Sequence, residues 1–138
     1  MALAPVQNQK QGPSQEYLLL DYLQRLGRSL EGRMAVHIHL SRLRPQNRQD
    51  HHVRIAATTF EGMTQTYDGQ VFILSSSDLF FVCKDASIDD IDAAILKVRH
   101  LFNEDPLTHG EEEEDMARFC TYYNVETQHE EMLDLIKQ

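Results

Sequence analysis

Hydrophobic side chains recur at helical spacing in the first third of the chain and in two further segments before residue 103. The first segment begins after Ser14, a residue type that caps helix N-termini, and ends before Gly32. Its leucines are spaced by four, three and four residues: Leu19, Leu23, Leu26 and Leu30. We therefore predict a first helix to about residue 30, a second over residues 50–66, and a third from Ser87 to about residue 102. Asp90 is expected to complete a capping box with Ser87.

Alternation replaces the helical spacing from Met34 to Leu40, where every second residue is apolar and the intervening residues include His37 and His39. This pattern predicts a strand with both histidines on one face. Two short strand-forming runs, residues 71–74 and 79–83, are separated only by SSSD, which predicts an antiparallel hairpin. Aromatic and β-forming residues over 118–127 predict another strand, and residues 128–137 predict a closing helix.

The order of these elements predicts the fold class. A helical crossover followed by a hairpin indicates an α+β domain with an antiparallel or mixed sheet and helices packed on one face of it, in a ferredoxin-like layout. The third helix is expected to bury Ile91, Ala94, Ile95, Val98, Leu101 and Phe102. One core is expected to contain Leu23, Ile38, Phe60, Phe81, Ile95 and Val98.

A single domain is expected, because 138 residues allow one hydrophobic core but not two ordinary domains. Residues 1–13 are rich in Gln, Pro and Gly without apolar periodicity, so we interpret them as a flexible leader to a domain spanning residues 14–138. The run EEEED at 111–115 predicts a solvated acidic loop over residues 107–116, since adjacent carboxylates repel one another and stay hydrated.

The formal net charge of −9 argues against nucleic acid as a partner, because Lys and Arg supply the affinity for phosphates. The charge is also uneven. Residues 33–54 contain five arginines and one acid, whereas residues 100–138 contain eleven acids and only Arg118 and Lys137 as basic residues. This asymmetry favours two surfaces of opposite charge that bind different partners or each other.

The compartment is predicted from what the sequence lacks. No apolar run approaches the roughly 20 residues of a membrane-spanning helix, so we expect no membrane insertion. The N-terminus has no basic segment leading into an apolar stretch, which argues against a secretory signal and for a cytoplasmic protein. Cys83 and Cys120 lie in apolar contexts without metal-ligand spacing and are predicted to be reduced thiols in the core.

Histidines offer the one grouping that suggests a metal. His37 and His39 share a strand face, and His51 and His52 open the following helix, so a four-histidine zinc site is conceivable. No cysteine or acidic residue lies at metal-ligand spacing from them, and we predict no metal and no cofactor. The serines at 75–77 lack the GxSxG turn of a serine hydrolase. The chain has no complete catalytic site, and we predict that it is not an enzyme.

The element order, together with the SSSDL sequence of the hairpin turn at 75–79, resembles the GGDEF domain of bacterial diguanylate cyclases over residues 33–102. The resemblance implies that Asp78 is the retained acid of the signature. It also implies that His39 stands where the family carries its first metal-binding Asp, and that Asn47 stands where the family carries an Asn that reads guanine.

The departures from the family decide what the resemblance implies about activity. Phosphoryl transfer needs Mg²⁺ held by carboxylates and a backbone that approaches the phosphates closely. Here three serines stand in place of the two glycines of the family's turn, which restricts the backbone, and a single Asp remains. Residues 65–69 also lack the family's RxxD product-binding site. The resemblance therefore implies a degenerate GGDEF-like domain of the kind found N-terminal to EAL phosphodiesterase domains.

We therefore expect a catalytically inactive regulatory domain that acts by protein–protein interaction or dimerisation in bacterial cyclic-di-GMP-type signalling. The alternative is a nucleotide-binding regulatory domain that holds GTP or cyclic-di-GMP through Asn47 and Asp78. The first helix carries more apolar surface than one core-facing stripe requires. Either its own domain packs it on two sides, or it forms an interaction surface for a protein partner or a second copy. The residues predicted for that surface are Leu18, Leu19, Tyr22 and Leu26.

Overall fold

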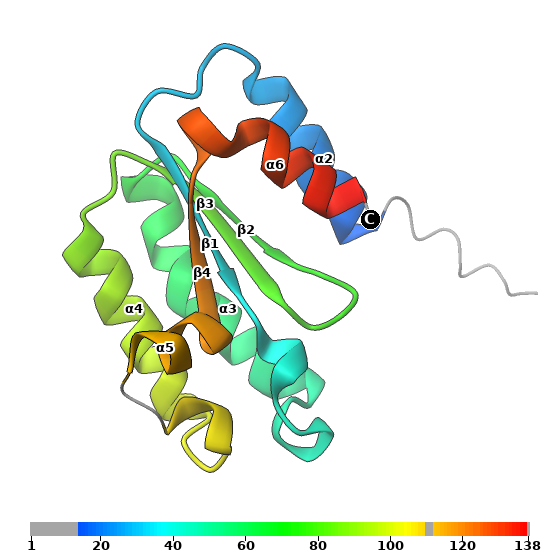
Figure 1. Cartoon of the computed structure of the whole chain (residues 1–138), viewed down its shortest axis with the longest axis vertical. Helices are drawn as coiled ribbons and strands as arrows, with labels where there is room; N and C mark the ends of the chain where they lie inside the picture. Colours follow the sequence, from blue (N-terminus) through cyan, green and yellow to red (C-terminus); the bar gives the residue numbers. More distant parts are fainter. Residues whose placement is uncertain (1–13, 110–111, 138) are drawn as a thin grey trace, which may run out of the picture.

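The computed structural model describes residues 14–109 and 112–137 and has an α+β fold (Figure 1). Four strands in these residues form one sheet: β1 (Arg33–Ile38), β2 (Gln70–Ile73), β3 (Leu79–Lys84) and β4 (Cys120–Asn124). The described α-helices are α2 (Gln15–Leu26), α3 (Asp50–Thr66), α4 (Ile88–Leu101), α5 (Glu113–Phe119) and α6 (Val125–Lys137). Short 3-10 helices lie in the connections: η1 (Leu40–Arg42), η2 (Pro45–Asn47) and η3 (Pro106–Thr108). The leader predicted over residues 1–13 lies outside the described residues.

The sheet has the strand order β2-β3-β1-β4, and every neighbouring pair of strands is antiparallel. Of the two alternatives predicted, antiparallel or mixed, the antiparallel one is confirmed. The order β1, α3, β2, β3, α4, β4, with β1 and β3 in the centre of the sheet, is the ferredoxin-like arrangement. In the described residues, no helix combines the length and the apolar character needed to cross a membrane.

Helices cover both faces of the sheet, so the prediction of helices on one face is wrong (Figure 1). Residues of α3 and α4 pack on one face, whereas α2 and α6 lie side by side and pack on the other. Strand side chains alternate between faces, so the sheet divides the buried residues into two clusters. In β3, Leu79 and Phe81 belong to the α3/α4 layer, and Phe80 and Val82 belong to the α2/α6 layer.

The prediction of one core is therefore wrong for one residue. Leu23 is fully buried, but it lies in the α2/α6 layer. The other five residues do share the α3/α4 layer: Ile38, Phe60, Phe81, Ile95 and Val98. Leu101, also expected to be buried, is 46% exposed, while its neighbour Phe102 is buried. Periodicity shows that a helix has an apolar stripe, but it does not show which face of the sheet the stripe covers.

The predicted starts of the first three helices are confirmed, and the predicted end of the first helix is wrong. The Ser14 hydroxyl accepts a hydrogen bond from the Tyr17 N–H, and α2 begins at the next residue. The helix ends at Leu26 rather than near residue 30, because Gly27 takes a positive φ of 49° and terminates it. The Ser87 hydroxyl likewise caps α4, but the capping box is incomplete because the Asp90 carboxylate accepts its hydrogen bond from the Tyr67 hydroxyl.

The wide apolar surface of α2 packs within its own domain. Leu19 is 0% exposed, and Tyr22 and Leu26 pack half-buried against the same α2/α6 layer. Nε2 of His129 in α6 lies 2.8 Å from the Leu23 carbonyl oxygen and ties the two helices together. Of the four residues predicted to form an interaction surface, only Leu18, 37% exposed, is accessible to a substantial degree. The prediction is therefore wrong for Leu19, because α6 and the sheet cover the apolar face of α2.

The acidic segment is more ordered than predicted. We expected a loop over residues 107–116, but η3 occupies its beginning and α5 begins within the acidic run. The Glu112 N–H donates to the Asp115 carboxylate in a capping box, and acidic side chains near a helix N-terminus are favoured by the helix dipole. The strand predicted over residues 118–127 is present as the shorter β4, because α5 ends at Phe119 and α6 begins at Val125. The closing helix begins earlier than predicted, at Val125, and Gln128 marks a kink with φ of −117°.

Candidate functional site

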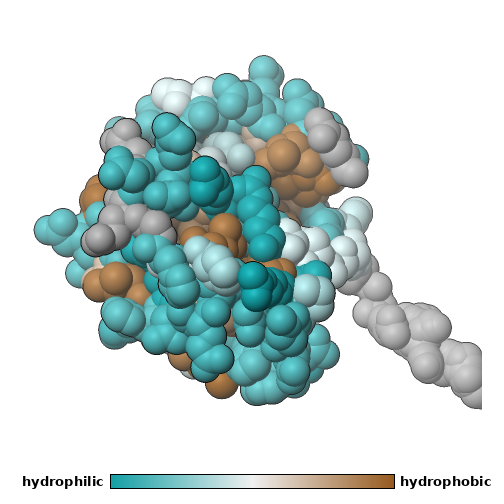
Figure 2. Space-filling model, turned by 60° about the horizontal axis from the view of Figure 1, so that its bottom comes forward, coloured by the Kyte–Doolittle hydropathy of each residue, from teal (hydrophilic) through white to brown (hydrophobic). Residues whose placement is uncertain are grey.

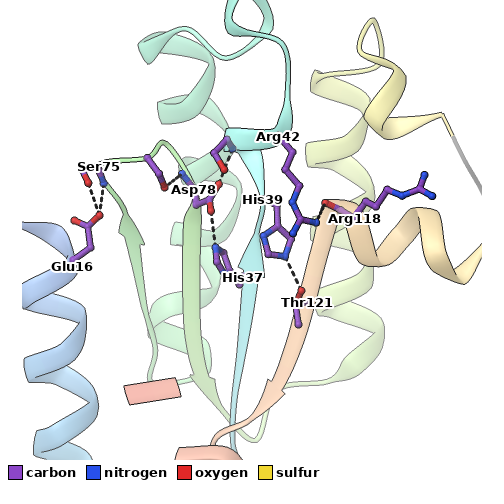
Figure 3. A network of polar contacts seen from close by, with 10 residues as sticks. Glu16, His37, His39, Arg42, Ser75, Asp78, Arg118 and Thr121 are labelled. Atoms are coloured by element: carbon purple, nitrogen blue, oxygen red, sulfur yellow. Dashed lines mark hydrogen bonds and ion pairs between the residues drawn. The ribbon is translucent and has the colours of Figure 1, made fainter. Parts of the chain in front are cut away.

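The end of β1 brings polar side chains together on the α2/α6 side of the sheet. His37 is in β1 and His39 directly follows the last residue of that strand, and their rings lie against each other on one side of the sheet, as the alternation predicted. Their ring centroids are 4.2 Å apart. Asp78 directly precedes β3, the strand beside β1, and its carboxylate points at His37 (Figure 3). We call His37, His39 and Asp78 the histidine cluster.

Asp78 is buried, and both of its carboxylate oxygens have hydrogen-bond partners. Its Oδ2 lies 2.8 Å from Nε2 of His37, and its Oδ1 accepts a hydrogen bond of 2.7 Å from the Ser41 N–H. Burial by itself would raise the pKa of Asp78, but the hydrogen bonds from His37 and Ser41 outweigh that effect and hold the pKa below its usual value. Asp78 is therefore a carboxylate at neutral pH.

His39 is held in the neutral form. Its Nε2 lies 2.7 Å from the Thr121 hydroxyl on β4. Burial, the adjacent His37 and the Arg42 guanidinium lower the pKa of His39 to about 4. His37 differs from it, because its Nδ1 is buried and has no hydrogen-bond partner among the described residues. One ring nitrogen of the pair is therefore left unsatisfied inside the protein.

The histidine cluster has the composition of a metal site, which the sequence did not predict. One ligand atom from each of its three side chains lies within 4.8 Å of the other two. No acidic residue lies at metal-ligand spacing from the histidines in the sequence, but β1 and β3 pair and bring Asp78 to them across 41 residues of chain. His51 and His52 do not belong to the cluster. They lie at the start of α3, where the centroids of their rings are 4.0 Å apart.

Asn47, the other predicted ligand-binding residue, lies in a separate network. Its Nδ2 donates to Oδ2 of Asp105 at 2.9 Å, and the Arg44 N–H donates to the same oxygen at 2.8 Å. Within the part of the chain that the structure describes, no hydrogen bond or ion pair joins Asn47 to Asp78. The two residues therefore do not form one ligand-binding group through direct contacts.

The polar groups of the hairpin turn between β2 and β3 also make contacts within the protein. The backbone N–H and the hydroxyl of Ser75 donate to Oε2 of Glu16 at 2.9 and 2.5 Å (Figure 3). Ser77 takes a positive φ of 82°, which a non-glycine residue rarely adopts. The N–H and hydroxyl of Ser75 are thus bound to α2 and would have to leave Glu16 to bind the phosphate of a nucleotide.

A second feature lies between α4 and β4. A groove of about 880 Å³ is lined mainly by apolar side chains of these elements and of α5. We call it the α4/β4 groove; its lining includes Ile88, Asp92, Leu96, Met116, Thr121 and Tyr122. The Tyr122 hydroxyl donates to the Asp92 carboxylate, and both burial and this bond raise the pKa of Tyr122.

The groove lies beside an open edge of the sheet. β4 pairs with β1 on one side, and no described strand pairs with its other side. Three large apolar side chains of the groove are also partly exposed: Ile88, Leu96 and Tyr122. One face of the molecule, seen in Figure 2, is mostly hydrophilic with a few separate hydrophobic areas. The sequence held a signal for this surface, because Ile88 and Leu96 fall outside the predicted buried face of α4.

The ferredoxin-like arrangement occurs in proteins of unrelated function, so the fold alone assigns no activity. The argument for function therefore depends on the histidine cluster and the α4/β4 groove. No protein-family model, no curated protein and no solved structure matches this chain.

Proposed function

We propose that this chain is a catalytically inactive regulatory domain, GGDEF-like in its element order, that acts by binding a partner protein in the α4/β4 groove. The observation that carries the proposal is the groove itself, an apolar surface beside an unpaired strand edge. A strand edge offers backbone donors and acceptors, and exposed apolar side chains next to it favour the addition of a partner's strand.

The contacts of Asp78 and the residue type at position 39 support the proposal that the domain has no diguanylate cyclase activity. Two magnesium ions on a nucleoside triphosphate require several carboxylate oxygens. Asp78 is the one acid of the signature, and both of its oxygens accept hydrogen bonds within the protein. His39 stands at the position where the family has its first metal-binding carboxylate, and imidazole is a poor ligand for Mg²⁺.

The nucleotide-binding alternative has less support. Asn47 would have to exchange its bond to Asp105 for one to a guanine base, and that exchange leaves a buried carboxylate without one of its donors. Ser75 would likewise have to leave Glu16. The observed contacts therefore favour a protein partner over GTP or cyclic-di-GMP.

Charge indicates which kind of partner fits the groove. The charged lining residues are Asp92 and Arg99, so the lining itself is balanced. The helix α5, which supplies Met116 and Ala117 to the lining, adds with its cap the carboxylates of Glu112, Glu114 and Asp115 against Arg118. The net charge of −9 opposes association of two copies through an acidic region. We therefore commit to a partner segment that is extended, has apolar residues at alternate positions and carries Lys or Arg between them.

Two labelled ten-residue peptides test this proposal by fluorescence anisotropy with the whole chain. One alternates valine with lysine and the other alternates valine with glutamate. We expect the lysine peptide to bind more tightly, and Leu96→Gln to weaken it by about tenfold, since burial of a leucine side chain contributes about 1.5–3 kcal/mol. Ile55→Gln is the matched control, because Ile55 is 50% exposed on α3 and Leu96 is 51% exposed on α4.

Equal binding of the two peptides, binding of neither, or an unchanged affinity in Leu96→Gln would overturn the proposed groove partner. A dimer detected by light scattering and lost in Leu96→Gln would instead assign the groove to a second copy of the chain. The inactive state has its own test. Incubation with GTP and Mg²⁺ should yield no cyclic-di-GMP, and a product that disappears in Asp78→Ala would contradict it.

A further inference from the structure

The histidine cluster has geometry that the proposed function does not use. His37 lies near the end of β1, His39 directly follows the last residue of that strand, and Asp78 approaches from the turn directly before β3 (Figure 3). A zinc ion binds imidazole nitrogen at about 2.0–2.1 Å and carboxylate oxygen at about 2.0–2.2 Å, so ligand atoms around a tetrahedral ion lie about 3.4 Å apart. The three side chains already lie within 4.8 Å of one another, and small side-chain rotations suffice to surround an ion.

Neighbouring groups hold two of the three side chains in place. The Ser41 N–H fixes Oδ1 of Asp78 and leaves Oδ2 turned toward His37. The Thr121 hydroxyl bonds one nitrogen of His39, and bonds of this kind orient the histidine ligands of metal sites. Strong orientation of ligands by their neighbours is what distinguishes a formed site from a chance meeting of side chains.

His37 provides a second, independent observation. Its Nδ1 is buried and has no hydrogen-bond partner among the described residues, which costs free energy in the structure as it stands. An ion held by the three side chains would take one nitrogen from each imidazole and one oxygen from Asp78. Coordination through Nδ1 of His37 would give this buried nitrogen a partner, while Nε2 of the same ring keeps its hydrogen bond to Asp78.

The ligand types select the metal. Two imidazoles and one carboxylate suit zinc and related first-row transition ions, whereas Mg²⁺ prefers oxygen ligands throughout. Three protein ligands also leave a coordination position for water or for a group from a partner. We propose that His37, His39 and Asp78 form a binding site for one Zn²⁺ ion, which would link β1 to the hairpin before β3. This site shares Thr121 with the lining of the α4/β4 groove, but none of its three ligands lines that groove.

Titration calorimetry of the whole, untagged chain with Zn²⁺ tests the inference. We expect one ion per chain, and a tenfold or greater loss of affinity in His37→Gln, His39→Gln and Asp78→Asn. Mg²⁺ in large excess should not compete. The matched control is the double variant His51→Gln with His52→Gln, which removes two adjacent histidines of the same chain away from the cluster and should bind Zn²⁺ as the parent does.

A buried histidine can also matter for folding, so a readout on the unmodified protein is needed. Co²⁺ added to the parent chain should give the strong visible absorption of a four-coordinate ion with nitrogen and oxygen ligands, and Zn²⁺ should remove that absorption. The inference is overturned if no ion binds, if His39→Gln binds as tightly as the parent while its circular dichroism is unchanged, or if the His51 and His52 variant abolishes binding.

Discussion

Nδ2 of Asn47 donates a hydrogen bond of 2.9 Å to Oδ2 of Asp105, a residue 58 positions further along the chain. The same carboxylate accepts from the backbone N–H groups of Arg44 and Leu107. Asp105 is buried, so these three donors replace water around it. The carboxylate thereby connects the segment around η2 to η3.

Asp105→Asn is expected to lower the free energy of unfolding by about 1–3 kcal/mol at pH 7, since hydrogen bonds to a charged acceptor are among the stronger ones. Burial by itself would raise the pKa of Asp105, but the bonds from Asn47, Leu107 and Arg44 hold it below its usual value. A pKa that is lower in the folded state means stability that is present above the unfolded pKa of about 3.9 and lost as the pH falls below it. Urea unfolding from pH 7 to pH 2 should show the difference between parent and variant shrinking below about pH 4. A difference that stays constant over this range would contradict the assignment.

Leu19→Ala should be far more costly than Leu18→Ala, although the two residues are adjacent in α2. Leu19 is fully buried between the sheet and α6, so its truncation removes apolar contacts and leaves a cavity, at a cost of about 2–5 kcal/mol. Leu18 is partly exposed, and its truncation should cost less than about 1 kcal/mol. Chemical unfolding of both variants measures the difference. Equal losses would mean that α2 does not pack as described.

Gly69→Ala is expected to destabilise the protein, whereas Gly62→Ala is expected to leave its stability unchanged or to raise it. A Cβ at Gly69 would lie 2.2 Å from the Val82 carbonyl oxygen, so the backbones of two neighbouring segments would have to separate. A Cβ at Gly62 meets nothing within 4 Å, and alanine in a helix interior is favoured over glycine by about 1 kcal/mol. Thermal unfolding should show a lower Tm for the first variant and an unchanged or higher Tm for the second. A stable Gly69→Ala variant would show that β2 and β3 do not approach this closely.

Both cysteine thiols should resist alkylation in the folded protein. Cys83 and Cys120 are free and buried, as predicted from the sequence, and burial raises the pKa of each thiol to about 11. Since the thiolate is the reactive form, iodoacetamide at pH 8 should label neither residue within the time in which it labels the chain in urea. Mass spectrometry of the two samples gives the comparison. Rapid labelling of the folded chain would contradict the burial of these residues.

Local patterns predicted most of the secondary structure. The helix over residues 50–66 was predicted to its last residue, because its apolar positions are regular and Gly69 follows soon after. The end of α2 was placed too late, since both Gly27 and Gly32 can end a helix and the apolar spacing continues to Leu30. The helix α5 was missed because a run of carboxylates is unfavourable in isolation, while its position at a helix N-terminus makes it favourable.

The candidate site was much less predictable, because it depends on contacts between distant segments. The alternation in β1 did place His37 and His39 on one face. The approach of Asp78 to them follows from strand pairing, and the bond between His39 and Thr121 joins residues 82 positions apart. The resemblance to a family pointed to Asn47 and Asp78 but not to Asp105 or Ser41, which are the residues that bind them.

The bond between His129 and Leu23 spans 106 positions of the chain and has a consequence for biosynthesis. Closing a loop of that length costs about 4 kcal/mol in chain entropy, and α2 lacks its contacts with α6 until α6 is present to share the α2/α6 layer. On the ribosome, β1, β2 and β3 emerge long before Met132 does, so the face of the growing sheet that carries Phe80 and Val82 then lacks the cover that α6 supplies later. A nascent chain of this kind offers chaperones a hydrophobic surface until its final helix has been translated.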